Sequence, residues 1–230
     1  MKLLAFETAT EACSVAVYID GDVRERFELA PRKHAELSLP WAEQLLAEAG
    51  IAKSQLDAIA IGRGPGAFTG VRLAIAIAQG MALALDRPIV PVSTLAALAM
   101  QSQGEHILAA IDARMGEVYS AAFARNGDDL VSSAEIVSAP DAVLLPDAAQ
   151  AWHGVGTGFA AGEGALQHRL GSRLSQVDAA ALPHAGDVAR LAALAFARGE
   201  ALAPERVEPA YLRDNVALTI AEQQALRASR

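Results

Sequence analysis

The stretch "IGRGPGAFTGVRLAIAIAQG", residues 61–80, places a glycine-rich loop between an apolar run and a helical run. The apolar run predicts a buried strand over about 56–61, and the second run predicts a helix from about Thr69 to Leu85. Thr69 is of a residue type that caps helices. Glycines allow tight turns and close approach to neighbouring backbone. The candidate loop residues are Gly62, Gly64, Pro65, Gly66, Phe68, Thr69 and Gly70.

Two common phosphate-binding loops do not fit this stretch. A Walker A loop needs a lysine after its last glycine, and residues 62–72 contain none. The segment GRGPGA, residues 62–67, matches G-x-G-x-x-A, but a dinucleotide fold needs an acid after the next strand, where Ser93 and Thr94 stand. An anion site at the helix N-terminus and a purely structural turn both remain open.

The helix after the loop is apolar on almost every side. Between residues 71 and 86 its polar side chains are Arg72, Gln79 and Asp86, which fall on nearly one line. A helix with one face in water carries a broad polar arc. The run over 34–49 has a similarly wide apolar arc. We therefore expect both helices to be covered on two sides, by their own sheet and by another subunit.

The predicted interface takes residues from both helices. Coverage by other helices of this chain is the alternative. The small residues along 74–80 would let a second helix approach closely. The interface candidates are Leu37, Trp41, Leu45, Arg72, Ile75, Ala78, Gln79 and Ala82.

The two halves of the chain read alike. Residues 3–21 and 108–127 each contain an apolar strand ending in an acid, Glu7 or Asp112, then a turn, a β-prone run and a glycine turn. This spacing indicates two related α/β lobes, each with a mixed sheet flanked by helices. We place the N-terminal lobe at 1–102 and the C-terminal lobe at 103–230, whose tail, with a short helix, could return to the first lobe.

Composition narrows the function classes. The chain has 230 residues, a net charge of −8 and one cysteine, Cys13, so an internal disulfide is excluded. Its basic residues are scattered, which argues against unaided nucleic-acid binding. We find no signal peptide and no run near the ~20 apolar residues of a membrane span. These features predict a soluble cytoplasmic protein without a membrane partner.

Several segments together resemble one family. "FETATEACSVAVY", "RKHAELSLPWAEQLLAEAG", "IGRGPGAFTGVRLAIAIAQGMAL", "VSTLAAL", "AAIDARMGEVY" and "PAYLR" occur in the order seen in the bacterial tRNA threonylcarbamoyladenosine biosynthesis family TsaB, or YeaZ. The resemblance runs from residue 2 to about 215. It implies an actin-like ATPase, ribonuclease H-like fold with two related lobes.

The resemblance also implies a function. This family is similar to TsaD, the catalytic subunit with which it pairs, and implies a noncatalytic scaffold and dimerisation subunit. With the ATPase subunit TsaE, the pair transfers threonylcarbamoyl from its adenylate to the adenosine beside the tRNA anticodon. The implied contact is a helical bundle that uses 34–49 and 69–85, with a homodimer when TsaD is absent. The tRNA would then be met only through the complex.

The residues themselves offer no catalytic or metal site. Where the catalytic relative carries a histidine-rich metal motif, this chain has residues 93–98, STLAAL, and its five histidines form no HxxxH or HExxH pair. The turns after Glu7 and Asp112 lack the glycines that actin-like ATPases use against phosphate. We expect no cofactor on this chain alone, while a nucleotide at a subunit junction stays open. The alternatives are a glycoprotease-type metallopeptidase and an actin-like small-molecule kinase.

Overall fold

The computed structural model describes residues 1–146 and 151–213. The first lobe contains a five-stranded sheet in the order β3-β2-β1-β4-β5, in which β1, β2 and β3 are antiparallel and β4 and β5 run parallel to β1. Its elements are β1 (Lys2–Glu7), β2 (Ala12–Ile19), β3 (Asp22–Leu29), α1 (His34–Ala49), β4 (Ala58–Gly62), α2 (Phe68–Leu85), β5 (Ile89–Val92) and α3 (Thr94–Ala99).

The second lobe repeats this arrangement, with the order β11-β10-β6-β7-β8 and with β9 added against β7. Here too three antiparallel strands are followed by two strands parallel to the first. The predicted relation between the two halves is therefore confirmed at the level of topology. The elements are β6 (His106–Arg114), β7 (Glu117–Asn126), β8 (Asp129–Ser132), β9 (Ile136–Ser138), β10 (Trp152–Val155), α4 (Ala161–Leu170), β11 (Leu174–Asp178) and α5 (Ala185–Ala197).

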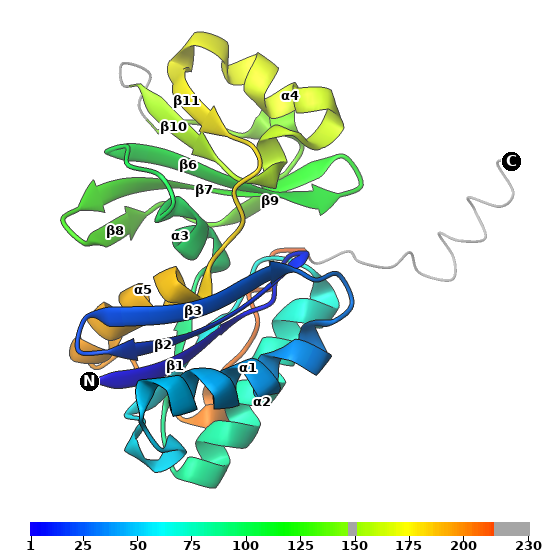
Figure 1. The fold of residues 1–230 in the computed structure, drawn as a ribbon. Helices are drawn as coiled ribbons and strands as arrows, with labels where there is room; N and C mark the ends of the chain where they lie inside the picture. The colour runs from blue at the N-terminus through cyan, green and yellow to red at the C-terminus, as the bar shows by residue number, and fades with distance from the viewer. Residues whose placement is uncertain (147–150, 214–230) are drawn as a thin grey trace, which may run out of the picture.

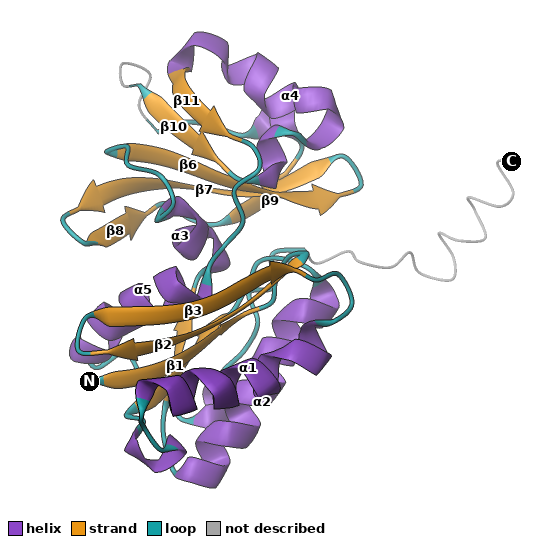
Figure 2. Ribbon diagram, in the orientation of Figure 1, coloured by secondary structure: helices purple, strands orange, loops and turns teal. Residues whose placement is uncertain are grey.

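Alternating side chains of each sheet enter two separate cores. In the first sheet, Leu4 and Phe6 face α1 and α2, whereas Leu3 and Ala5 face α5. Figure 1 shows the resulting layers, with α1 and α2 below the first sheet, α5 and α3 between the sheets, and α4 on the far side of the second sheet. The secondary structure of these layers is coloured in Figure 2.

The two lobes exchange helices. Helix α5, from the second half of the sequence, packs on the first sheet, while α3, from the first half, packs Leu95 and Leu98 against the second sheet. The chain then returns to the first lobe, where Leu202 pairs with Ile89 and Val207 enters the core beneath α2. This amends the division at residue 102, because α5 and the segment 201–207 complete the first lobe. The helix predicted near the C-terminus lies outside the described residues.

The helix boundaries agree with the sequence apart from one cap. Helix α1 ends at Gly50, whose left-handed conformation closes it, and the Ser93 hydroxyl caps α3 by accepting from the Ala96 amide at 3.1 Å. The prediction for Thr69 was wrong. Helix α2 begins at Phe68, its N-cap is Ala67, and no side chain caps it. Thr69 is therefore an exposed residue of the first turn.

Candidate functional site

The glycine loop packs on the turn that follows β1. A Cβ atom at Gly62 would overlap the Glu7 carboxylate, and one at Gly70 would overlap the Thr8 carbonyl oxygen. A Cβ atom at Gly66 would meet Ala9 in the same way. The loop therefore needs glycine at these positions because the turn lies directly against its backbone.

Hydrogen bonds hold the loop to this turn. The Ala67 amide donates to the Ala9 carbonyl at 2.7 Å, and the Thr8 hydroxyl donates to the Gly70 carbonyl at 2.7 Å. The Gly64 amide donates to the Thr94 hydroxyl at 3.2 Å. These amides, which a phosphate would need as free donors, already have partners. The geometry thus supports the structural turn, and Pro65, also buried, belongs to it.

Glu7 is a buried acid beneath this loop. Its carboxylate accepts from the Ala9 amide at 2.7 Å and from the Thr94 hydroxyl at 2.9 Å. Burial raises the pKa of Glu7 to about 7, although these hydrogen bonds lower it in part. Glu7 therefore exchanges its proton near neutral pH inside the first lobe.

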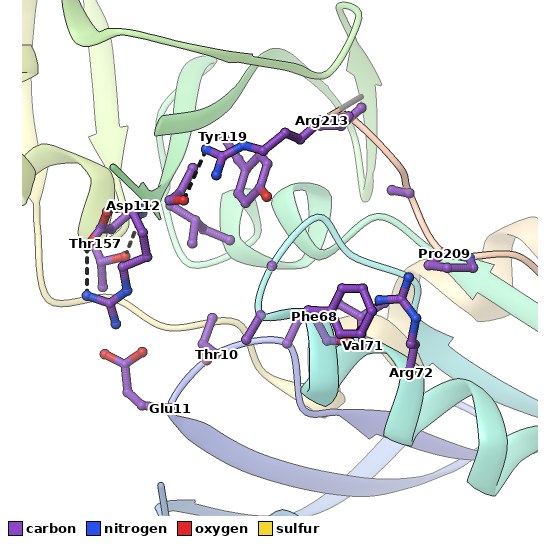
Figure 3. Close-up of a pocket in the computed structure, with 18 of the residues that line it drawn as sticks. Thr10, Glu11, Phe68, Val71, Arg72, Asp112, Tyr119, Thr157, Pro209 and Arg213 are labelled. Atoms are coloured by element: carbon purple, nitrogen blue, oxygen red, sulfur yellow. Dashed lines mark hydrogen bonds and ion pairs between the residues drawn. The ribbon is translucent and has the colours of Figure 1, made fainter. Parts of the chain in front are cut away.

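A cleft of about 570 Å³ separates the lobes at the ends of β1 and β6. Its floor contains the turns after Glu7 and Asp112, and its mouth contains Phe68 and the segment 209–213. Figure 3 shows Asp112 and Thr157 on one side of this cleft and Phe68 with Arg72 on the other. The sequence indicated the two turns, but the contribution of segment 209–213 depends on the chain's return to the first lobe.

The structure places four of the predicted interface residues inside the first lobe. Leu45, Ile75, Ala78 and Ala82 are buried in the core between the helices and the first sheet. They are corrected as interface candidates, because the chain's own sheet already covers them. This is the cover by the chain's own sheet that the sequence predicted for one side of the helices.

The other four predicted interface residues lie nearer the surface. Trp41 is half-buried against the first core, and Leu37 is half-buried on α1. Gln79 donates to the Pro204 carbonyl at 2.9 Å, so it is held by the returning chain. Arg72 lies at the cleft and donates to the Tyr211 hydroxyl at 2.9 Å. Of these four residues, Leu37 and Trp41 of α1 make no such tertiary hydrogen bond within the described part of the chain.

The exposed apolar surface lies on another side of the same helices. Six of the 18 residues of α2 are buried, and its outward residues are mostly apolar. Leu83 is 68% exposed and Leu39 of α1 is 47% exposed. We call this surface the α1–α2 face and define it by Leu39, Leu73, Ala76, Gly80 and Leu83. Three of the residues of α2 that the sequence suggested, Ile75, Ala78 and Ala82, lie in the core and not on this face.

The length of α2 bears on the expectation about membranes. Among the described residues, α2 is the one helix long and apolar enough to cross a membrane by length and composition. One such helix is weak evidence, and α2 contributes Val71, Ala74 and Ile75 to the core of the first lobe. Its apolar character is explained by that core on one side and by the α1–α2 face on the other.

Metal ligands are not gathered in the described part of the chain. Within residues 1–146 and 151–213, no three His, Cys, Asp or Glu side chains are grouped so that they could hold a metal ion. His34 instead contacts the carbonyl oxygens of Thr10 and Ala12 at 3.0 and 3.1 Å, which ties α1 to the turn after β1.

Comparison with known proteins agrees with this architecture. Residues 27–221 match the family described as "TsaD: tRNA N6-adenosine threonylcarbamoyltransferase". The chain is 43% identical to the tRNA threonylcarbamoyladenosine biosynthesis protein TsaB of Escherichia coli, over 94% of this chain and 96% of that protein. The Haemophilus influenzae TsaB is 38% identical over 94% and 95%.

A solved structure extends the match to the fold. YeaZ from Pseudomonas aeruginosa superposes with a TM-score of 0.86 at 45% identity, covering 92% of this chain and 99% of that one. The two lobes with their mixed sheets have the actin-like, ribonuclease H-like fold. The chain therefore belongs to the TsaB (YeaZ) family of tRNA threonylcarbamoyladenosine biosynthesis proteins, which is related to TsaD.

Proposed function

We propose that this chain is the noncatalytic scaffold subunit that pairs with TsaD in the complex that forms threonylcarbamoyladenosine on tRNA. The α1–α2 face carries the proposal. Leu39 on α1 and Leu83 on α2 are exposed leucines, and the exposed Ala76 and Gly80 on α2 are small residues at which another helix can approach closely. Such a surface on a soluble subunit is typical of a partner contact.

In this function the chain orients its partner and carries out no chemical step. TsaD supplies the transfer of threonylcarbamoyl from its adenylate to the adenosine beside the anticodon, and the ATPase subunit TsaE joins the pair. The same α1–α2 face forms a two-fold homodimer when TsaD is absent, since an apolar helical face can be self-complementary. The complex works in the cytoplasm.

The chain by itself binds no nucleotide tightly under this proposal. The hydrogen bonds of Gly64 and Ala67 support it, because these loop amides donate to the protein's own oxygens. A nucleotide at the junction with another subunit is compatible with the same geometry. Calorimetry with the isolated chain and ATP tests this point, and tight binding would favour the kinase alternative. Stoichiometric metal in elemental analysis would favour the metallopeptidase.

A pair of alanine variants tests the α1–α2 face. Ala76→Glu places a charge on the face, and Ala165→Glu places the same charge on the exposed side of α4, on the other lobe. Burying an unpaired carboxylate in a contact costs several kcal/mol, so Ala76→Glu should weaken binding to TsaD by more than ~100-fold. In gel filtration, Ala165→Glu should co-elute with TsaD. Co-elution of Ala76→Glu at the parental level would refute the proposed contact.

A further inference from the structure

Four arginines that are far apart in the sequence line the interlobe cleft. We call them the arginine rim: Arg32, Arg72, Arg114 and Arg213. Two carboxylates, Glu11 and Asp112, line the same cleft. The whole chain carries a net charge of −8, so this is a locally positive site on an acidic protein. A cleft of this kind attracts polyanions.

Two members of the rim, Arg32 and Arg114, are exposed and have an unusual backbone conformation. Arg32 and Arg114 have φ angles of 70° and 63°, in the left-handed region that L-residues rarely adopt. The Arg114 side chain is 82% exposed, and among the described residues Arg32 has no hydrogen-bond or ion-pair partner. Both guanidinium groups are therefore available to a ligand.

The paired members keep donors free. Arg114 contacts Asp112 at 3.0 Å, and Arg213 pairs with Glu117. A guanidinium has five N–H donors, and an exposed ion pair contributes little free energy. At Arg114 a phosphate can therefore add to the ion pair or displace it. Arg213, whose side chain is 17% exposed, also donates to the Ala113 carbonyl at 3.2 Å and keeps its position.

Aromatic rings stand beside the rim. The Arg72 guanidinium lies 3.3 Å from the centre of the Phe68 ring and 5.1 Å from that of Tyr211, and Figure 3 shows Arg72 over Phe68. Phe68 is 64% exposed and Tyr211 is 61% exposed. Exposed rings next to arginine planes are the surfaces on which unpaired RNA bases stack.

The floor of the cleft is a poor site for a free nucleotide. The Ala9 amide donates to Glu7, the Arg114 amide to Asp112 at 2.7 Å, and the Asp112 amide to the Thr157 hydroxyl at 3.2 Å. These three amides are therefore not available as donors to a polyphosphate. The arginine and aromatic side chains that line the cleft can instead bind an extended phosphodiester chain.

We propose that the arginine rim and the Phe68–Tyr211 rings bind single-stranded RNA of the tRNA substrate. The inference rests on the proposed function, which brings tRNA to the complex. It amends the expectation that the chain meets tRNA only through its partners, because the rim lets the chain contact RNA directly once the complex is assembled.

The test uses the complex with TsaD and unmodified tRNA. The double variant Arg32→Gln, Arg114→Gln removes two exposed charges, and Lys53→Gln, whose ammonium contacts only Glu43, is the control for charge. We expect the double variant to weaken tRNA binding at least tenfold and to reduce the slope of log affinity against log salt by about 1.4, the value for two single-strand phosphates. Lys53→Gln should leave both unchanged. Tyr211→Ala should weaken binding with little change in slope.

Assembly with TsaD, followed by gel filtration, separates this inference from the proposed function. If the double variant assembles and binds tRNA with parental affinity and slope, the RNA assignment is wrong while the scaffold function stands. If ATP competes with tRNA at the rim, or if only TsaE affinity falls in the double variant, the occupant is a nucleotide or a protein and the proposal is overturned. If the parental chain fails to assemble with TsaD, the proposed function fails first.

Discussion

Helices α2 and α4 occupy matching places in the two lobes but present opposite surfaces. Each follows the strand, β4 or β10, that pairs in parallel with the first strand of its sheet. The exposed residues of α4 include Glu163, Gln167 and Arg169, whereas those of α2 include Ala76 and Leu83. One scaffold thus carries a helix suited to water in the second lobe and a helix suited to a protein partner in the first.

The loops before these two helices, unlike the outer surfaces of the helices, are similar in the two lobes. In the first lobe, Gly62 and Gly70 pack on the turn after β1. In the second, Gly156 and Gly158 would each meet Ala110 of β6 if they carried a Cβ atom. Both lobes therefore use glycine for close packing at the end of the first strand. The two helices differ on their outer sides, so variants that compare inner and outer positions are the most informative.

The largest loss of stability is expected when a charge is introduced on the inner side of α2 and not on its outer side. Ala78 is fully buried, and Ala76 is exposed. Ala78→Glu should cost on the order of 5 kcal/mol, since the carboxylate would be buried without a partner. Ala76→Glu should leave the free energy of unfolding within about 0.5 kcal/mol. Urea unfolding of the isolated chain measures both, and equal stabilities would contradict the placement of α2.

The next largest change in stability is expected from substitutions at two glycines of the same helix. A Cβ atom at Gly70 would overlap the Thr8 carbonyl, whereas one at Gly80 meets nothing within 4 Å. Gly70→Ala should destabilise the chain by about 3 kcal/mol or more. Gly80→Ala should stabilise it by about 0.5 to 1 kcal/mol, because alanine favours the helix. Thermal unfolding of both variants checks this, and a Gly70→Ala protein of parental stability would rule out the close packing.

The third effect concerns the buried acid of the first lobe. The pKa of Glu7 rises from 4.5 to about 7 on folding, so the folded chain holds more protons between these values. This contribution to stability is present below pH 4.5 and is lost as the pH rises through 7, by about 3 kcal/mol. Glu7→Gln should flatten the fall between pH 5 and 8. Urea unfolding across this range is the measurement, and a parental slope in the variant would exclude Glu7 as its source.

The smallest effect is expected where α5 docks on the first sheet. A hydrogen bond that His184 donates to the Glu25 carboxylate raises the pKa of His184, opposed in part by burial. Its contribution is therefore present below pH 6.5 and is lost as the pH rises through the higher folded value. Because the pair is partly exposed, the loss should stay below about 1 kcal/mol. Hydrogen exchange at the Gly186 amide, which donates to Glu25, measures this loss of stability as the pH rises. In His184→Gln the exchange should not show this change with pH.

Much of the fold could be predicted from local sequence. The strands of the two hairpins and β4 followed from apolar runs, and the repeat of residues 3–21 at 108–127 indicated two lobes. The strands β10 and β11 were not predicted. The prediction for Thr69 failed because its cap position depends on how the loop meets Ala9. The exchange of α3 and α5 between the lobes was also missed, since a helix pattern does not state which sheet it covers.

The sequence by itself determined that α2 is apolar around nearly its whole circumference, and this already required cover on two sides. It did not determine which side meets the chain's own sheet, because such a helix has no polar arc to orient it. Only the tertiary structure placed Ala78 inside and Ala76 outside. The same is true of the arginine rim, since Arg32 and Arg213 become neighbours of one cleft only when the chain folds back over the first lobe.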